Sequence, residues 1–143
     1  MKKQAEPARR RAREAAFRVV YQADVTRDSY EQAWGARRDH ERLSEDQGAL
    51  VNDILRELVE RPLEVDQHIR EAADRWTLER LSATDRSILR SAVAELMGRP
   101  GTPVRVVLDE AIELAKRYGS DGSGGFVNGV LDRVARILRP AEF

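Results

Sequence analysis

The chain has 143 residues, enough for one domain around a single hydrophobic core. It has no cysteine, which excludes disulfides and thiolate metal sites, and its 25 basic and 25 acidic side chains give a formal net charge of zero. It has neither an apolar run of about 18 residues nor the apolar centre of a signal peptide, so we expect a soluble, unexported protein of the cytoplasm.

The charges are unevenly distributed along the chain. The first 20 residues carry seven basic and two acidic side chains, a net charge of +5, whereas residues 28–66 carry five basic and eleven acidic ones, a net charge of −6. Such asymmetry favours a polyanion at one face and a basic protein at another. Alternatively, the basic segment is only a well-solvated helix, and composition leaves both possibilities open.

The spacing of apolar residues predicts helices from end to end. We expect residues 1–7 to be a flexible basic segment, with Pro7 as the first residue of a helix that runs to about Val25. A short helix follows over Tyr30 to Arg38. Because no segment alternates with a period of two, the pattern predicts one compact all-α domain of about seven helices over residues 8–140.

Start and stop signals divide the middle of the chain. Ser44-x-x-Gln47 is a capping-box pattern that opens a third helix, and Pro62 should break that helix because proline cannot donate to the helical ladder. A fourth helix should end near Trp76. Ser82-x-x-Asp85 then gives a second start signal.

Glycines mark the junction between the last two predicted helices. Thr102-Pro103 should cap the first of them, and Gly119 stands where a left-handed C-cap is expected. Ser120 to Gly125 form a predicted loop without bulky side chains, with Ser123 as the N-cap of a final helix. Pro140 should end that helix.

An arginine cluster near the N-terminus is the strongest functional signal in the residues themselves. Arg9, Arg10 and Arg13 lie within about one helical turn, and their forked donors suit phosphates and the faces of bases. Phe17 and Tyr21 offer aromatic surfaces nearby, a combination typical of single-stranded RNA recognition. Alternatively, both rings belong to the core and the arginines only keep the protein soluble.

The glycine-rich segment has two interpretations. As an RNA contact it needs accessible backbone amides, the edge of Phe126 and the amide of Asn128, whereas a plain connector needs none of these. No strand precedes the segment and no Gly-Lys-Ser/Thr follows it, which argues against a nucleotide-hydrolysing loop. Gly129 costs about 1 kcal/mol relative to alanine inside a helix, so we expect it to serve close packing or the approach of a ligand.

Nothing in the sequence indicates catalysis. The carboxylates of Asp109, Glu110 and Glu113 share one predicted helix, but they alternate with arginines as on a solvated face. His40 and His68 lie in separate segments, and there is no nucleophile elbow or HExxH motif. We therefore expect no catalytic residue, no metal and no cofactor.

Three blocks of sequence carry a family resemblance. The first comprises Arg9 to Glu14 and Tyr21, the second lies between Trp76 and Leu96, and the third runs from Glu110 to Asp132. Together they resemble the NusB family of bacterial transcription antitermination factors. The resemblance implies a protein that binds a single-stranded boxA-type leader element of nascent ribosomal RNA together with a small ribosomal protein that doubles as NusE. Such a factor acts within the antitermination complex of RNA polymerase.

The same resemblance implies two sets of site residues. Arginines and a lysine would neutralise phosphates, aromatic residues would stack on bases, and an asparagine would form a hydrogen bond. The RNA-binding set is Arg9, Arg10, Arg13, Tyr21, Lys116, Ser123, Phe126 and Asn128, and the partner-binding set is Glu79, Asp85 and Glu95. Family members include monomers and homodimers, so either state is compatible with the chain.

Some residues depart from the family pattern. Ala94 stands where an aromatic tyrosine is usual, which would weaken a partner or packing contact there. Gly122 and Gly124 leave the loop less charged, which favours RNA contacts through backbone amides. The alternative function is a stand-alone protein-interaction or RNA-binding module related to the N-terminal domain of RNA cytosine methyltransferases.

Overall fold

A computed structural model describes the backbone of residues 2–74 and 77–143 and the side chains from Ala8 on. These residues form seven α-helices, two short 3-10 helices and no strand, which confirms the predicted all-α fold. The elements are α1 (Lys2–Thr26), α2 (Tyr30–Glu41), α3 (Glu45–Glu60), α4 (Pro62–Ala73), η1 (Leu78–Arg80), α5 (Ala83–Gly98), α6 (Val104–Tyr118), α7 (Ser123–Leu138) and η2 (Pro140–Glu142).

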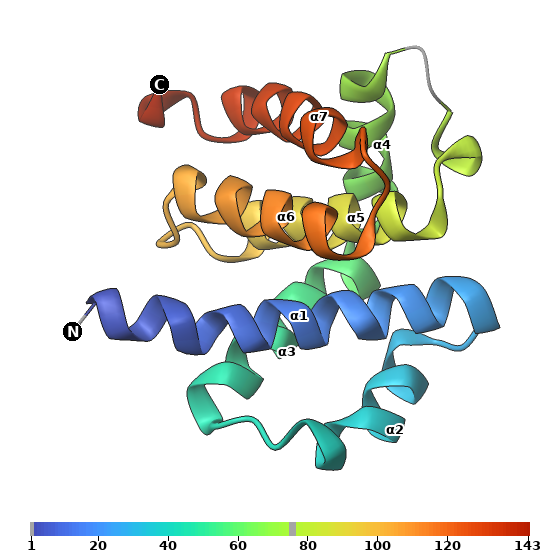
Figure 1. Cartoon of the computed structure of the whole chain (residues 1–143), viewed down its shortest axis with the longest axis vertical. Coiled ribbons are helices and arrows are strands. Elements are labelled where there is room, and N and C mark those ends of the chain that lie inside the picture. The colour runs from blue at the N-terminus through green and yellow to red at the C-terminus, as the bar shows by residue number, and fades with distance from the viewer. Residues whose placement is uncertain (1, 75–76) are drawn as a thin grey trace.

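Helix α5 lies at the centre of the molecule. It packs against α1, α3, α4, α6 and α7, that is, against five of the six other α-helices. In Figure 1, α1 crosses the middle of the molecule, with α2 on one side, α4 to α7 on the other, and α3 crossing behind it. Helix α6 lies between α1 and α7, which makes the end of α6 the link between the two segments expected to bind RNA.

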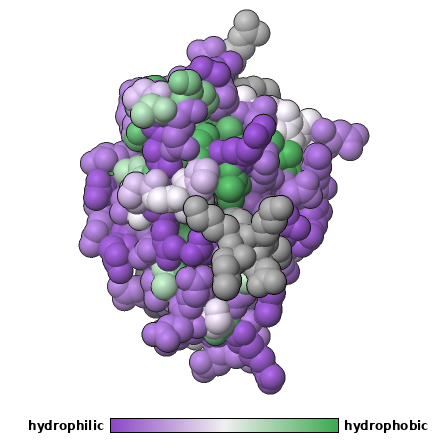
Figure 2. Space-filling model, turned by 90° about the vertical axis from the view of Figure 1, so that its left-hand side faces the viewer, coloured by the Kyte–Doolittle hydropathy of each residue, from purple (hydrophilic) through white to green (hydrophobic). Residues whose placement is uncertain are grey.

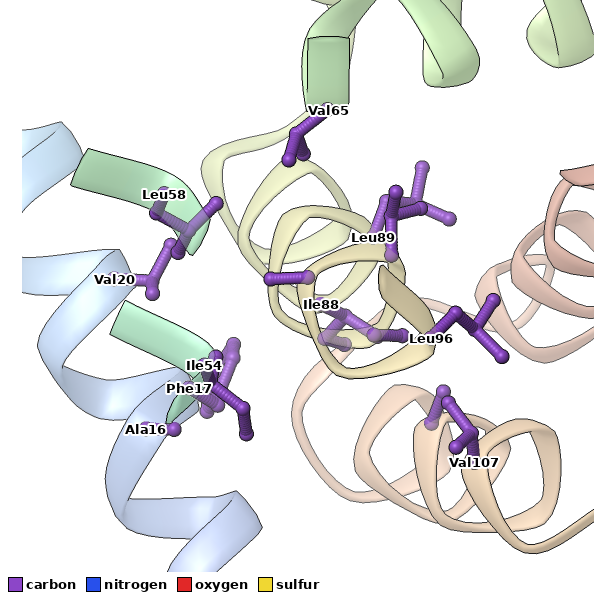
Figure 3. Packing of buried hydrophobic residues seen from close by; sticks show 14 of the residues in the cluster. Ala16, Phe17, Val20, Ile54, Leu58, Val65, Ile88, Leu89, Leu96 and Val107 are labelled. Carbon is purple, nitrogen blue, oxygen red and sulfur yellow. The ribbon is translucent and has the colours of Figure 1, made fainter. Parts of the chain in front are cut away.

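The core forms around the apolar residues of α5. Ile88 and Leu89 are 1% and 0% exposed, and Figure 3 shows them between side chains of α1, α3, α4 and α6. Phe17 and Val20 enter this cluster from α1, and Ile54 enters it from α3. Because burial of each such side chain contributes about 1.5–3 kcal/mol, this cluster fixes α1 relative to α5 and α6.

The surface differs from the core in composition. The face with both chain ends is mostly hydrophilic, with hydrophobic residues in small separate areas (Figure 2). Across residues 2–74 and 77–143, no helix combines the length and apolarity that crossing a bilayer requires.

Several predicted helix ends are confirmed. Ser44 and Gln47 form the capping box of α3, and the Ser82 hydroxyl accepts a hydrogen bond from the backbone N–H of Asp85 at the start of α5. Pro62 separates α3 from α4, as predicted. Helix α4 ends at Ala73, and the predicted end near Trp76 lies outside the described residues.

Helix α1 begins earlier than predicted, at Lys2 rather than at Pro7. The intervening residues include glutamine, alanine and glutamate, which favour helix, and a proline this close to the N-terminus removes few ladder bonds. The flexibility expected of residues 1–7 stays a prediction.

The glycine-rich junction differs from the prediction in three ways. Gly119 is the C-cap of α6, but its φ of −93° is not left-handed. A Cβ atom at Gly119 would lie 2.5 Å from the Ser123 Oγ and 2.7 Å from the Ala115 carbonyl oxygen, so close packing explains this glycine. The N-cap of α7 is Gly122, and Ser123 to Gly125 form the first helical turn, so the loop is shorter than predicted.

The start of α6 is capped from a distant part of the chain. Pro103 is its N-cap and has no side-chain cap hydrogen bond, and Thr102 is buried. Instead, the backbone N–H of Val104 donates to the Glu142 carboxylate at 2.9 Å. This contact, together with the Arg139 side chain, lowers the pKa of Glu142.

Candidate nucleic-acid interface

The arginines of α1 have two different environments. Arg10 and Arg13 lie three positions apart on the helix, yet the Arg10 side chain is 59% exposed and the Arg13 side chain is 5% exposed. The difference arises because Arg13 points toward α5, whereas Arg10 lies over the edge of α6.

Arg10 is exposed and held in place by one carboxylate. Its Nε donates to both oxygens of Glu110 at 3.0 and 3.1 Å, and the Glu110 side chain is only 8% exposed. The hydrogen bond to Glu110 raises the pKa of Arg10. Because these bonds use Nε and the side chain is mostly exposed, the two Nη groups suit a phosphate.

Arg13 forms a buried ion pair, which corrects the surface roles predicted for both partners. Its Nε and Nη2 donate to the Glu95 carboxylate, each at 2.9 Å, and Glu95 is 2% exposed. Its Nη1 lies 3.8 Å from the Glu110 carboxylate. Arg13 therefore helps to position Glu110, which in turn holds Arg10. The Glu95 side chain is buried, so it cannot contact a protein partner at the surface.

The remaining predicted residues of α1 are at or near the surface. Arg9 is partly exposed and its Nε lies 3.4 Å from the Asp46 carboxylate. Tyr21 is 39% exposed, whereas Phe17 is buried, so the two rings expected to act together have separate roles. Their centroids are 6.1 Å apart, which anchors the Tyr21 ring against the core.

Glu14 connects the end of α6 to α1. Its carboxylate accepts hydrogen bonds from Arg117 and from the Tyr118 hydroxyl, and it pairs with Arg18 at 3.2 Å. Arg18 also donates to the Tyr118 hydroxyl at 3.0 Å. The contact with Glu14 raises the pKa of Arg117. This cluster places the α6–α7 junction directly beside α1.

None of these connecting residues is predicted from the sequence to have a functional role. Arg117 follows Lys116 in the last turn of α6, where cations complement the helix dipole. This position in the helix is the one sequence feature that could have indicated a role for Arg117. The Tyr118 ring lies 5.2 Å from Phe17 between centroids. Only the tertiary fold brings Tyr118 onto Phe17, because about 100 residues separate them in sequence.

Two predicted RNA contacts share a cavity between α6 and α7. Lys116 and Asn128 line a space of about 530 Å³ together with Gly124 and Gly125, and both are exposed. Ser123 is 3% exposed and its hydroxyl accepts from the backbone N–H of Ser120 at 3.0 Å. Its side chain therefore closes the loop, which corrects the RNA contact predicted for it.

Phe126 lies in an adjoining cavity. This space of about 400 Å³ is bounded by the end of α4 and the first turns of α7, and Gly125 lines both cavities. Phe126 is half-buried and packs against the core with part of its ring. Phe126 and Asn128, the two predicted α7 contacts besides Ser123, thus line neighbouring spaces that share Gly125.

The predicted partner residues are not equivalent. Glu79 is exposed and accepts from Arg70 at 2.9 Å, and this hydrogen bond lowers the pKa of Glu79. It lines a cavity of about 660 Å³ with Asp24 and Arg86. Asp85 is half-buried in the first turn of α5.

Ala94, the departure from the family pattern, is fully buried in α5. The change therefore concerns internal packing, and a surface contact at this position is excluded.

Comparisons of the chain with known proteins agree with this architecture. The NusB family model matches residues 10–136. A transcription antitermination protein NusB of Anaeromyxobacter dehalogenans is 43% identical over 138 residues, which cover 94% of each chain. The protein of the same name from Syntrophomonas wolfei is 39% identical over 127 residues, covering 89% of this chain and 95% of its own.

Solved structures show the same fold. T. maritima NusB superposes with a TM-score of 0.84 at 39% identity and covers 90% of both chains. A structure described as antitermination factors NusB and NusE in complex with double-stranded RNA superposes with a TM-score of 0.82 at 25% identity, covering 92% of this chain and 98% of its own. With a family model matched over most of its length and relatives of this identity, the chain belongs to the NusB family.

Proposed function

We propose that this protein is a transcription antitermination factor without catalytic activity. It binds a single-stranded boxA-type leader element of nascent ribosomal RNA together with the small ribosomal protein that acts as NusE. Family membership and the names of the relatives support the antitermination role, and the similar complex of NusB, NusE and RNA supports both partners. The complex would hold elongating RNA polymerase in a termination-resistant state.

The RNA face is the surface formed by exposed predicted residues on α1, the end of α6 and the start of α7. Arg10 and Lys116 neutralise phosphates there, and Arg9 widens the positive surface. Tyr21 and Phe126 contact unstacked bases, which favours a single strand because bases in a duplex do not expose their faces. Asn128 donates or accepts a hydrogen bond at a base edge or the backbone.

One observation carries this proposal: the Glu14 cluster joins the end of α6 to α1. Through Arg117 and Tyr118 it brings Lys116 and the cavity at the α6–α7 junction beside the cationic helix. A flexible strand that leaves Arg10 therefore reaches the α7 cavities along a continuous surface.

A titration of labelled ribosomal leader RNA tests the function. We expect specific binding to the leader sequence, weaker binding to a scrambled RNA of the same composition, and tighter leader binding when the ribosomal protein is added. Equal affinity for both RNAs would contradict sequence-specific recognition. Specific RNA binding that the ribosomal protein leaves unchanged would favour the stand-alone module instead.

The partner face is a separate surface around Glu79 and the cavity that it shares with Asp24 and Arg86. Acidic side chains there suit a basic ribosomal protein. Replacement of Glu79 by lysine should weaken binding of the ribosomal protein and leave RNA binding by the isolated chain unchanged. Glu64→Lys, at an exposed position of α4, is the matched control. Equal loss of both activities in Glu79→Lys would mean that the two faces are one.

A further inference from the structure

The cavity beside Phe126 is lined by charged side chains in addition to the aromatic ring that base stacking requires. It is lined at the end of α4 by Asp74 and on α7 by Phe126 and Arg133. In Figure 1 the start of α7 lies next to α4, and the two helices pack against each other. An aromatic wall, an acidic side chain and a basic side chain thus surround one space of about 400 Å³.

The two charged residues are positioned differently. Asp74 is exposed at the C-cap of α4, where its φ is +59°. Arg133 is exposed, and its Nη1 donates to the Ala72 carbonyl oxygen at 2.6 Å, which fixes the guanidinium at the cavity wall. Since a guanidinium has five N–H donors, others remain for a ligand.

Two glycines form an open side of the cavity. Gly125 and Gly129 lie four positions apart on α7, hence on one face, and a Cβ added at either would meet no atom within 4 Å. Close packing within the chain therefore does not explain Gly129, although glycine costs about 1 kcal/mol at such a helical position. The remaining reason for a glycine at position 129 is the close approach of an external ligand.

We propose that this cavity binds one guanine base of the RNA strand, splayed out of the stack. This inference rests on the proposed function and adds a base preference to it. Guanine presents two adjacent donors, N1–H and N2–H, beside the acceptor O6 on its Watson–Crick edge. The Asp74 carboxylate accepts from both donors, Arg133 donates to O6, and the Phe126 ring contacts the base face. Adenine, cytosine and uracil lack this arrangement of two donors and one acceptor.

Single-base substitution in a labelled RNA tests the preference. The probes are 13-nucleotide oligouridines whose central base is guanine, inosine, adenine or cytosine, and binding is measured by fluorescence anisotropy. We expect guanine to bind about tenfold more tightly than adenine or cytosine. Inosine, which lacks the N2 amino group, should fall between them.

Two substitutions locate the preference in the cavity. Asp74→Asn should reduce the preference for guanine over adenine to the part that Arg133 provides through O6, because the amide no longer offers two acceptors. Asp121→Asn, in the neighbouring cavity, is the matched control and should keep the preference. A guanine preference of undiminished size in Asp74→Asn would overturn the assignment.

Gly129→Ala separates binding from folding. The added methyl group should raise Tm by about 2–4 °C, because alanine favours helix and meets no neighbour, yet it should weaken binding of the guanine oligomer severalfold. Gly35→Ala, equally open and helical, should raise Tm without any change in binding. Unchanged guanine binding in Gly129→Ala would exclude the cavity as the site.

The wild-type titration distinguishes failure of this inference from failure of the proposed function. Equal binding of all four oligomers would overturn the guanine site and leave RNA binding intact. No binding of any oligomer or of the leader RNA would contradict both.

Discussion

At the scale of single residues, neighbours in sequence have unrelated roles. Arg10 presents its guanidinium to solvent above Glu110, whereas Arg13 is enclosed with Glu95. A buried pair contributes little net free energy when it is complete, but removal of one partner leaves a charge without compensation and costs about 3–5 kcal/mol. An exposed pair contributes at most about 1 kcal/mol.

Arg13→Ala should therefore lower the free energy of unfolding by about 3–5 kcal/mol, measured by urea denaturation. Arg10→Ala, its matched control, should change that free energy by about 1 kcal/mol or less and instead weaken RNA binding. If Arg13→Ala unfolds like the wild type and loses only RNA affinity, the guanidinium is not buried in solution.

Gly119 is the C-cap of α6, as predicted, but glycine is needed there for a different physical reason. Its backbone is extended, so glycine is not required for conformational reasons, but a Cβ would overlap Ser123 and the Ala115 carbonyl oxygen. Gly119→Ala should destabilise the protein by about 1–3 kcal/mol in urea denaturation, the range for overpacking. Gly122→Ala, three residues away in open space, should have a much smaller effect. Equal effects would show that backbone freedom explains both glycines.

At the scale of elements, ion clusters determine how the helices are joined. Glu14 connects α1 to α6, and a second cluster connects three helices through Asp24 of α1, Asp66 of α4 and the arginines of α5. Arg86 and Arg90 both pair with Asp24, at 2.7 and 3.2 Å, and Arg90 also pairs with Asp66 at 2.9 Å. Apolar contacts are not directional. These ion pairs therefore add directional restraints to the apolar core.

Glu14→Ala should loosen the end of α6 against α1. We expect faster amide hydrogen exchange at Arg117 and Tyr118, weaker RNA binding and a small change in global stability, because the cluster is local. Glu14→Gln, whose carbonyl still accepts from Tyr118, should recover part of the affinity. Normal RNA affinity in Glu14→Ala would remove this cluster from the positioning of the RNA face.

The Asp24 cluster predicts a specific dependence on pH. The hydrogen bond from Arg86 lowers the pKa of Asp24 below its ordinary 3.8 in the folded protein. Ionised Asp24 therefore stabilises the fold at all pH values above 3.8, and this stabilisation is lost as the pH falls through the lower folded value.

The difference in unfolding free energy between the wild type and Asp24→Asn should thus be constant from pH 7 to about 5 and shrink below 3.8, as measured by urea denaturation at each pH. A difference that grows on acidification would have the wrong sign for an ionised, paired carboxylate.

At the scale of the whole molecule, a net charge of zero conceals the separation of a basic from an acidic region. RNA binding should weaken with rising salt, with a slope of about −0.7 in log K against log salt for each phosphate neutralised on a single strand. The double variant Arg10→Ala/Lys116→Ala should flatten the slope by about 0.7 for each contact removed. An unchanged slope would place the phosphates elsewhere.

The helices and most of their ends could be predicted from the sequence, whereas the RNA face stays a prediction. Helical periodicity, the Ser44 and Ser82 caps and Pro62 act within a few residues, so they can be recognised locally. The predicted surface contacts of Arg13, Glu95 and Ser123 depend instead on which side chains the fold buries. In the structure all three side chains are buried. Periodicity shows which residues share a helix face, but it does not show which faces another helix covers.

Which charges stay in contact with water, and which segments meet, depends on the tertiary packing. It placed Glu142 on the start of α6, Tyr118 on Phe17, and Asp74 opposite Arg133 across one cavity, although many residues separate each pair in sequence. Such contacts follow from the packing of whole helices around α5. The physical reason is that burial is a property of the assembled layers, and no local signal in the chain encodes it.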